Sequence, residues 1–234
     1  MDTLYTSRII AVFSVLTLFT LPVGAASTNL VYNGDFELGN TGFSSNYAYS
    51  SAPTTAEAVY TITTNPLSWH LAFVPIGDHT SGTGNMFVAN GDPTPGNIVW
   101  QSQLITVLPN TTYFFETWAT NVCCTPGFSG GDVPAILEFS VVGATVDTLG
   151  ATPIGYPAGT WQFFGRTWNS GANTSVTLNI LDQNTVPIGN DFSIDDIHFG
   201  TASSAVPLPP AIWLAGSGLL VLFGRMKRRP NIDS

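Results

Sequence analysis

Short runs of alternating hydrophobic and polar residues recur through the middle of this 234-residue chain. In one run, Val176, Leu178 and Ile180 would lie on one face of a strand, with the polar residues between them on the other. Similar runs, bounded by turn-forming residues, are 97–108, 109–120, 135–143, 160–171 and 192–199. Several short strands at this spacing predict an all-β domain, a sandwich or barrel, over residues 27–204.

The beginning of the chain has the order typical of a secretory signal peptide. Arg8 precedes an uncharged apolar stretch at 9–21, and small residues follow up to Ala26. We therefore expect residues 1–26 to be a signal peptide, cleaved after Ala25 or Ala26. The alternative is a retained membrane anchor, although the apolar stretch is short and ends at Pro22.

The end of the chain carries a second apolar stretch followed by basic residues. The 17 residues from Leu208 to Gly224 contain no charge, and as a helix they would reach about 25 Å at ~1.5 Å per residue. This is a marginal span for a hydrocarbon core of about 30 Å. The cations that follow would stay in the cytoplasm and hold the domain outside; they are Arg225, Lys227, Arg228 and Arg229. The alternative is a buried C-terminal helix of the domain.

The layout of residues 206–229 resembles the PEP-CTERM sorting tail of Gram-negative bacteria. The resemblance is carried by a proline motif, by Trp213, by Ser217-Gly218 and by the basic end; the motif residues are Val206, Pro207, Leu208, Pro209 and Pro210. The glutamate of the family's name is absent. The resemblance implies that residues 205–230 form a temporary anchor recognised by an exosortase, a membrane peptidase-transferase. It also implies a place at the inner membrane and then at the cell surface or in the extracellular matrix, together with exopolysaccharide.

The charge of the predicted domain excludes one class of partner. Residues 27–205 hold 13 acidic residues against one basic residue, Arg166, which gives a net charge of 1 − 13 = −12 with histidine neutral. Nucleic acid would be repelled, because binding it requires Lys and Arg facing the phosphates. An acidic, lysine-free domain suits an extracellular protein and suits cation binding.

Two segments of the predicted domain resemble the first and last strands of galactose-binding-like jelly rolls, the fold of many carbohydrate-binding modules. They are "NLVYNGDFELG" at 29–39 and "GNDFSIDDIHF" at 189–199, and the segments 85–91 and 113–121 fit internal strands of the same pattern. The resemblance implies a jelly-roll β-sandwich. It also implies a structural calcium ion where the first and last strands meet.

The acidic residues carried over to that calcium site are Glu37, Asp195 and Asp196, with Asp35 as a weaker candidate. Calcium accepts six to eight oxygen ligands in irregular geometry. Clustered carboxylates also need a counter-charge that this chain's few Lys and Arg residues do not supply. The alternative is that these side chains are solvated or cap turns.

Aromatic residues offer flat faces on which a sugar ring could lie, with polar side chains fixing its hydroxyl groups. The candidates are Trp69, Trp100, Trp118, Trp161, Trp168, Tyr47, Tyr49, Tyr60 and Tyr156. The alternative for each is a place in the core. In the run 113–118, Phe114, Glu116 and Trp118 would share one face of a strand.

Cys123 and Cys124 are adjacent and are the chain's only cysteines. After export they would meet an oxidising compartment, and we expect a disulfide between them, with free thiols or links to another chain as alternatives. Neighbouring Cα atoms lie about 3.8 Å apart across a trans peptide, below the roughly 4.4–6.8 Å of ordinary disulfides. Such a bond therefore requires a tight, distorted turn.

No catalytic motif has a convincing setting in this sequence. "GFSGG" at 127–131 matches a hydrolase pattern that requires a strand-to-helix turn, yet a strand-like run follows it. We therefore expect a non-enzymatic surface or matrix protein that binds exopolysaccharide. The alternatives are a purely structural or adhesive component and a polysaccharide-acting hydrolase.

Overall fold

The computed structural model describes residues 28–125, 133–186 and 188–204. Its first elements are β1 (Phe43–Ser44), β2 (Ala48–Tyr49), β3 (Val59–Thr63), the single-turn helix α1 (Pro66–Trp69), β4 (Met86–Asn90), β5 (Asn97–Ser102) and β6 (Ile105–Thr106). They are followed by β7 (Thr112–Asn121), β8 (Ile136–Val142), β9 (Val146–Pro153), β10 (Gln162–Asn169), β11 (Ser175–Asp182) and β12 (Asp191–Gly200). The all-β prediction is confirmed for these residues.

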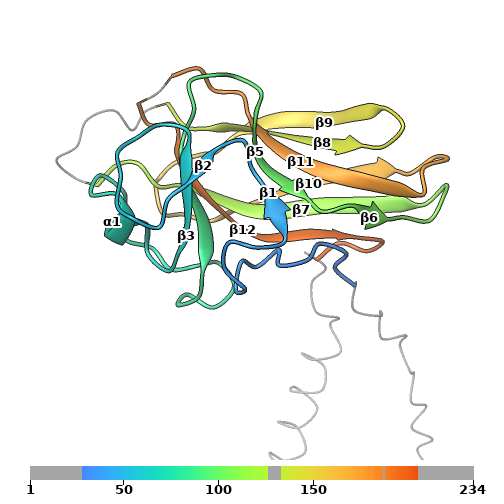
Figure 1. Cartoon of the computed structure of the whole chain (residues 1–234), viewed down its shortest axis with the longest axis horizontal. Helices are drawn as coiled ribbons and strands as arrows, with labels where there is room; N and C mark the ends of the chain where they lie inside the picture. Colours follow the sequence, from blue (N-terminus) through green and yellow to red (C-terminus); the bar gives the residue numbers. More distant parts are fainter. Residues whose placement is uncertain (1–27, 126–132, 187, 205–234) are drawn as a thin grey trace, which may run out of the picture. The chain divides into compact units, whose positions relative to one another are not determined.

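The strands form two sheets (Figure 1). The first sheet has the order β1-β5-β11-β8-β9, with β6 paired to β11, and the second sheet has the order β10-β7-β12-β4-β3-β2. All pairs are antiparallel except β2 with β3. The predicted β-sandwich is therefore correct in class, and β12 lies in the second sheet between β4 and β7.

The hydrophobic core lies between the two sheets and follows the alternation read from the sequence. Val176, Leu178 and Ile180 of β11 are buried in it, as are Tyr113 and Phe115 of β7. Burying each such side chain contributes about 1.5–3 kcal/mol. The other face of β7, with Trp118, points away from this core, so the polar and half-buried residues of the second sheet are available for a site.

A second hydrophobic cluster covers part of that outer face. The segment between β3 and β4, which includes α1, packs on it, and Trp69 and Phe73 bury Met86 and Val88 of β4. The indole N–H of Trp69 donates to the carbonyl oxygen of Ser50 over 3.0 Å. This cluster does not cover the part of the outer face beside β7 and β10, where the candidate site lies.

The opening segment 29–39 is not a strand, which corrects the prediction from the resemblance. It is a series of turns, because Asn33 and Phe36 both adopt φ of 55° in the left-handed region. The Asn33 side chain fixes these turns by donating to the carbonyls of Gly39 and Thr41 and by accepting from the backbone N–H of Leu38. The segment nevertheless lies beside the last strand, as expected.

Backbone hydrogen bonds hold the opening segment against β12. The N–H of Ile197 donates to the carbonyl of Gly34 over 2.8 Å, and the N–H of Leu30 donates to the carbonyl of Phe199 over 2.8 Å. Gly34 must be glycine here, because a Cβ atom at this position would lie 2.1 Å from the backbone oxygen of Ile197. The Asn-Gly pair of the opening motif is thus explained by packing.

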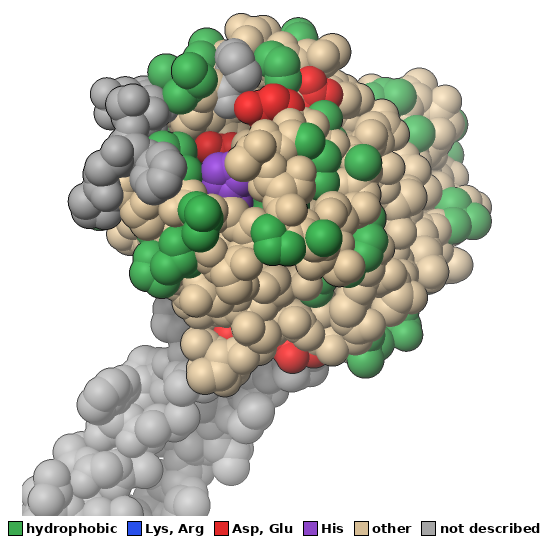
Figure 2. Space-filling view, turned by 60° about the vertical axis from the view of Figure 1, so that its left-hand side comes forward, with side chains coloured by type: hydrophobic (Ala, Val, Ile, Leu, Met, Phe, Trp, Pro, Cys, Tyr) green, Lys and Arg blue, Asp and Glu red, His purple; other side chains and the backbone are tan. Residues whose placement is uncertain are grey.

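One face of the domain carries acidic side chains without basic ones beside them in Figure 2. Figure 2 shows acidic groups and a histidine on the face that carries α1, with no Lys or Arg in that view. Arg166, the one Lys or Arg within the described residues, donates to the carbonyls of Leu149 and Gly165 and lies 5.7 Å from the ring centre of Phe139. It therefore neutralises none of the carboxylates discussed below.

The two predicted membrane segments lie outside the described residues. This applies to the signal peptide 1–26 and to the sorting tail with its motif and basic end. Within residues 28–204 as described, no helix is long and apolar enough to cross a bilayer.

Candidate functional site

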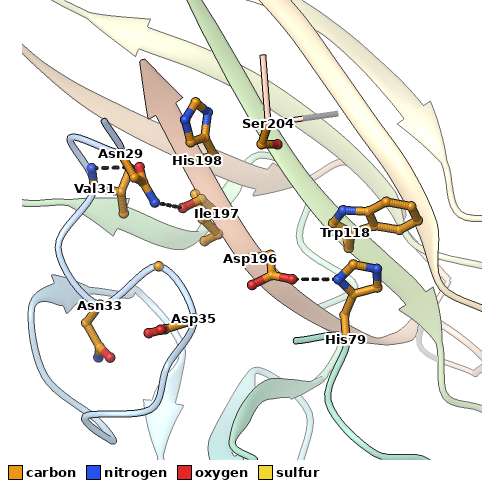
Figure 3. A pocket seen from close by; sticks show the side chains of 11 residues that line it. Asn29, Val31, Asn33, Asp35, His79, Trp118, Asp196, Ile197, His198 and Ser204 are labelled. Atoms are coloured by element: carbon orange, nitrogen blue, oxygen red, sulfur yellow. Dashed lines mark hydrogen bonds and ion pairs between the residues drawn. The ribbon is translucent and has the colours of Figure 1, made fainter. Parts of the chain in front are cut away.

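A pocket of about 490 Å³ lies where the outer face of the second sheet meets the opening segment and the last described residues. Figure 3 shows His79 and Trp118 on one side of Asp196, and Asn33 and Asp35 on the other. The walls thus come from β7, β12, the opening segment and the loop 77–85. Residues more than a hundred positions apart meet at this place.

An aromatic stack forms one wall of the pocket. The ring of His79 lies on the indole of Trp118, with ring centres 4.0 Å apart and planes inclined by 14°. Trp161 contacts His79 edge-on, with ring centres 5.8 Å apart, and Phe163 contacts Trp118 edge-on, with ring centres 5.5 Å apart. Phe163 is 38% exposed and Trp118 is half-buried, so aromatic surface reaches solvent here.

A β-bulge in β12 aims Asp196 at His79. Asp195 pairs with Trp118 and His198 pairs with Glu116, so three steps along β12 match two along β7. The extra residue lets Asp196 adopt a φ of 49°. Its Oδ2 atom lies 2.5 Å from Nδ1 of His79. A neutral His79 donates from Nδ1 to this carboxylate, which leaves Nε2 as an acceptor.

The loop 77–85 is held in place by carboxylates. Oδ2 of Asp195 accepts from the backbone N–H groups of His79 and Thr80, over 2.9 and 3.2 Å. Asp78 closes the loop by accepting from the N–H groups of Ser81 and Gly84, over 2.7 and 2.6 Å. Because these bonds fix the backbone on both sides of His79, the loop presents its ring to Trp118 in one orientation.

Glu37 fastens the far end of the same loop from the opening segment. Its Oε1 atom accepts from the backbone N–H of Asn85 over 2.7 Å, and Glu37 is exposed. Thr80 adds a hydroxyl donor to Asp196 over 2.6 Å. The three acids predicted to hold calcium are therefore all bound by donors from this loop and its end.

Burial changes the acidity of Asp195. Loss of solvent around its carboxylate, and next the negative charge of Asp196, raise the pKa of Asp195 to about 7. The backbone N–H groups that it accepts from lower the pKa by a smaller amount. Near neutral pH, Asp195 is thus only partly ionised.

The predicted calcium ligands do not form a ready metal site. Within the described residues, no group of three or more His, Cys, Asp or Glu side chains is arranged to hold a metal ion. The oxygens of Asp195 and Asp196 instead accept from N–H and O–H donors, which compete with a cation for the same lone pairs. Asp35, the weaker candidate, is exposed and accepts from the N–H of Glu37 over 3.4 Å. The calcium hypothesis stays a prediction.

Glu116 binds the last described residues to the outer face of β7. Its carboxylate accepts from the hydroxyl of Ser203 and from both the N–H and the hydroxyl of Ser204, the last two over 2.7 and 2.6 Å. Nδ1 of His198 lies 3.5 Å from the same carboxylate. Ser204, the last described residue, therefore lies at the edge of the pocket.

Similarities to solved structures were found, although no protein-family model and no curated protein matches this chain. The chain is similar to a Stig cyclase from Fischerella sp. TAU (10% identity, TM-score 0.52, covering 74% of this chain and 96% of that one). It is also similar to the CBM22-1 xylan-binding domain of Paenibacillus barcinonensis Xyn10C (12% identity, TM-score 0.48, covering 77% of this chain and 98% of that one). A third match is the active domain of a bacteriophage CBA120 tailspike protein (14% identity, TM-score 0.46), of which the chain spans 21%.

At these identities, the similarities concern the fold alone. The similarity to the Stig cyclase agrees with the two-sheet β-sandwich of this domain.

Most of the predicted aromatic candidates are core residues, which removes them as sugar platforms. The buried ones are Trp69, Trp100, Trp168, Tyr47 and Tyr60. Trp118 and Trp161 remain half-buried, and Tyr49 and Tyr156 are exposed. Among these four, Trp118 is the one that lines the pocket. His79 was missed, because nothing in its sequence neighbourhood indicates a partner 117 residues away.

The structure joins Cys123 and Cys124 by a disulfide. Their Cα atoms lie 3.0 Å apart across a cis peptide bond, rather than at the trans separation considered from the sequence. The "GFSGG" pattern at 127–131 lies outside the described residues.

Proposed function

We propose that this protein is an exported, non-enzymatic surface or matrix protein whose β-sandwich binds a neutral polysaccharide at the Trp118 pocket. The observation that carries the proposal is the His79–Trp118 stack in an open pocket of about 490 Å³. A sugar ring has an apolar face that packs on exposed aromatic surface, and it has hydroxyl groups around its edge. The pocket supplies both kinds of partner.

The polar groups of the pocket suit hydroxyl donors. Asp35 and Asp196 offer carboxylate oxygens, which accept from hydroxyl groups. Among the described residues, no Lys or Arg lines the pocket, and residues 27–205 carry a large negative charge. Polyanionic glycans would therefore be repelled, which favours a neutral chain.

Replacing Trp118 by alanine should weaken binding of a neutral polysaccharide at least tenfold, because the platform for the sugar ring is removed. Affinity gel electrophoresis with neutral arabinoxylan and neutral β-1,4-galactan measures the retardation. Tyr49→Ala is the matched control, since Tyr49 is an exposed aromatic residue that does not line the pocket. Equal retardation of the Trp118→Ala variant and the unmodified protein would overturn the assignment of the site.

We also propose that residues 205–230 sort the protein through an exosortase-type enzyme. The support is the sequence pattern of the tail, together with the position of Ser204 at the edge of the domain. Fractionation of the native host, with mass spectrometry of the C-terminus, should find a mature chain that lacks the basic end. A full-length chain in the cytosol that still carries residues 1–26 would contradict export.

A structural calcium ion bound by Glu37, Asp195 and Asp196 remains a separate hypothesis. Carboxylate oxygens are suitable ligands for calcium, but binding would require the donors on the loop 77–85 to release them.

A further inference from the structure

A second pocket, of about 160 Å³, lies away from the Trp118 site and has the disulfide in its wall. Cys123 and Cys124 line it together with Glu57, Asp191 and His70. Figure 2 shows acidic and histidine side chains gathered around a hollow on this face of the domain. At ~30 Å³ per water molecule, the pocket has room for about five waters, which is the size of one small ring rather than of a chain.

The disulfide supplies a rigid, apolar surface. The N–H of Cys123 donates to Oδ1 of Asn121 over 2.8 Å, and the N–H of Thr125 donates to the carbonyl of Ala72 over 2.8 Å. These bonds fix the backbone on both sides of the cysteine pair. Cys124 is half-buried, so part of the pair faces the pocket. Divalent sulfur is polarizable and packs well against apolar faces.

Two carboxylates at this pocket, those of Glu57 and Asp191, have no cationic partner among the residues that the structure describes. Asp191 is 5% exposed, and the hydrogen bond that its carboxylate accepts, from the N–H of Gly91, is long at 3.4 Å. Burial, and next the charge of Glu57, raise the pKa of Asp191 to about 7. Arg166, the one Lys or Arg in the described part of the chain, is bound on β9 and β10. A buried carboxylate of this kind is stabilised by a positive charge brought by a ligand.

Hydrogen-bonding groups complete the pocket. Nδ1 of His70 accepts from the N–H of Ala72 over 3.3 Å, so the neutral ring carries its proton on Nε2. Burial lowers the pKa of His70, which favours this neutral form. The amide N–H₂ of Asn90 donates to the carbonyl of Ala56 over 2.9 Å, which leaves its oxygen as an acceptor.

We propose that this second pocket binds a single amino-sugar residue. The apolar face of the ring would lie on the Cys123–Cys124 disulfide, and the ammonium group would lie against Glu57 and Asp191. His70 would donate to a hydroxyl oxygen of the ring. This ligand differs in charge from the neutral chain proposed for the Trp118 pocket, so the two sites can be tested separately.

A glucosamine trimer and a glucose trimer serve as probes, with binding followed by NMR titration of the ¹⁵N-labelled protein. We expect the glucosamine trimer to shift the signals of His70 and Cys124 and to bind at least tenfold more tightly than the glucose trimer. Glu57→Gln should remove most of this preference, because a charge-assisted contact is lost. Glu57 is exposed, so this variant should fold.

Glu138→Gln is the matched control, since it removes the same charge from the first sheet and should leave the preference intact. The unreduced protein should contain no free thiol, and reduction with a phosphine should weaken binding of the glucosamine trimer. Trp118→Ala should leave binding of the glucosamine trimer unchanged, whether or not the Trp118 pocket binds a neutral polysaccharide. Equal binding of both trimers, an equal loss in Glu138→Gln, or shifts confined to the Trp118 pocket would overturn the proposal.

Discussion

Gly34→Ala is expected to destabilise the domain by about 3 kcal/mol or more. A Cβ atom at this position would lie 2.1 Å from the backbone oxygen of Ile197, and backbone atoms of a central strand cannot move aside easily. The substitution would also weaken the bond from the N–H of Ile197 to the carbonyl of Gly34. At roughly 2–4 °C per kcal/mol for a domain of this size, calorimetry should show a loss of at least about 6 °C in Tm.

Gly39→Ala is the matched control for this effect. Gly39 lies in the same segment with a φ of +75°, but no atom lies within 4 Å of a Cβ built there. Backbone strain alone should cost about 1 kcal/mol. A Gly34→Ala protein that melts no lower than the Gly39→Ala protein would contradict the close packing of the opening segment on β12.

The melting temperature should rise by several degrees as pH falls from 8 to 6. Burial is the first cause that raises the pKa of Asp182 to about 6, and of Asp191 and Asp195 to about 7, from 3.8. Because these folded-state values lie above the unfolded one, stability is greatest when the carboxyl groups are protonated, and it is lost as pH rises through 6 to 7. Linkage gives roughly 2–3 kcal/mol over this interval.

Two histidines act in the opposite direction at the acidic end of this interval and reduce the rise there. Burial lowers the pKa of His70 and His198, so the stability from their neutral forms is lost as pH falls below the unfolded-state value of about 6.5. Asp191→Asn should flatten the rise in Tm, since it removes one of the three titrating groups. A Tm that is constant or falls between pH 8 and 6 would show that these carboxylates are not buried as described.

Calcium can be tested in the same melting experiment. An ion bound at Asp195 would replace the proton, so calcium chloride at pH 8 would raise Tm and a chelator would reverse the change. Isothermal titration would show uptake, and Glu37→Gln would reduce it. An unchanged Tm and no heat of binding would remove the calcium hypothesis and leave hydrogen bonding to the loop 77–85 as the role of these acids.

The regular strands were predictable from the sequence because alternation and burial agree there. In β11, the buried positions Val176, Leu178 and Ile180 alternate with polar residues as expected. The opening segment was not predictable in detail, because its turns depend on the Asn33 side chain and on contacts with β12. A hydrophobic pattern carries no signal for such long-range contacts. β9 was missed because its residues are mostly exposed or half-buried.

The candidate site was predictable only in part. Trp118 stood among nine aromatic candidates, and sequence reasoning could not separate it from core residues such as Trp100, since both occur in strand-like runs. The position of His79 depends on a β-bulge that re-aims Asp196 and on a loop fixed by carboxylates. These features arise from the pairing of distant strands, so no local motif reveals them.

The most direct test of the proposed function is an NMR titration of the ¹⁵N-labelled protein with xylan oligosaccharides and β-1,4-galactotriose. At least one of these neutral sugars should shift the indole N–H signal of Trp118 and the backbone signals of His79 and Asp196. Trp118→Ala should lose these shifts while the rest of its spectrum is preserved. Spectra that do not change with either sugar, or shifts that persist in Trp118→Ala, would contradict binding at this pocket.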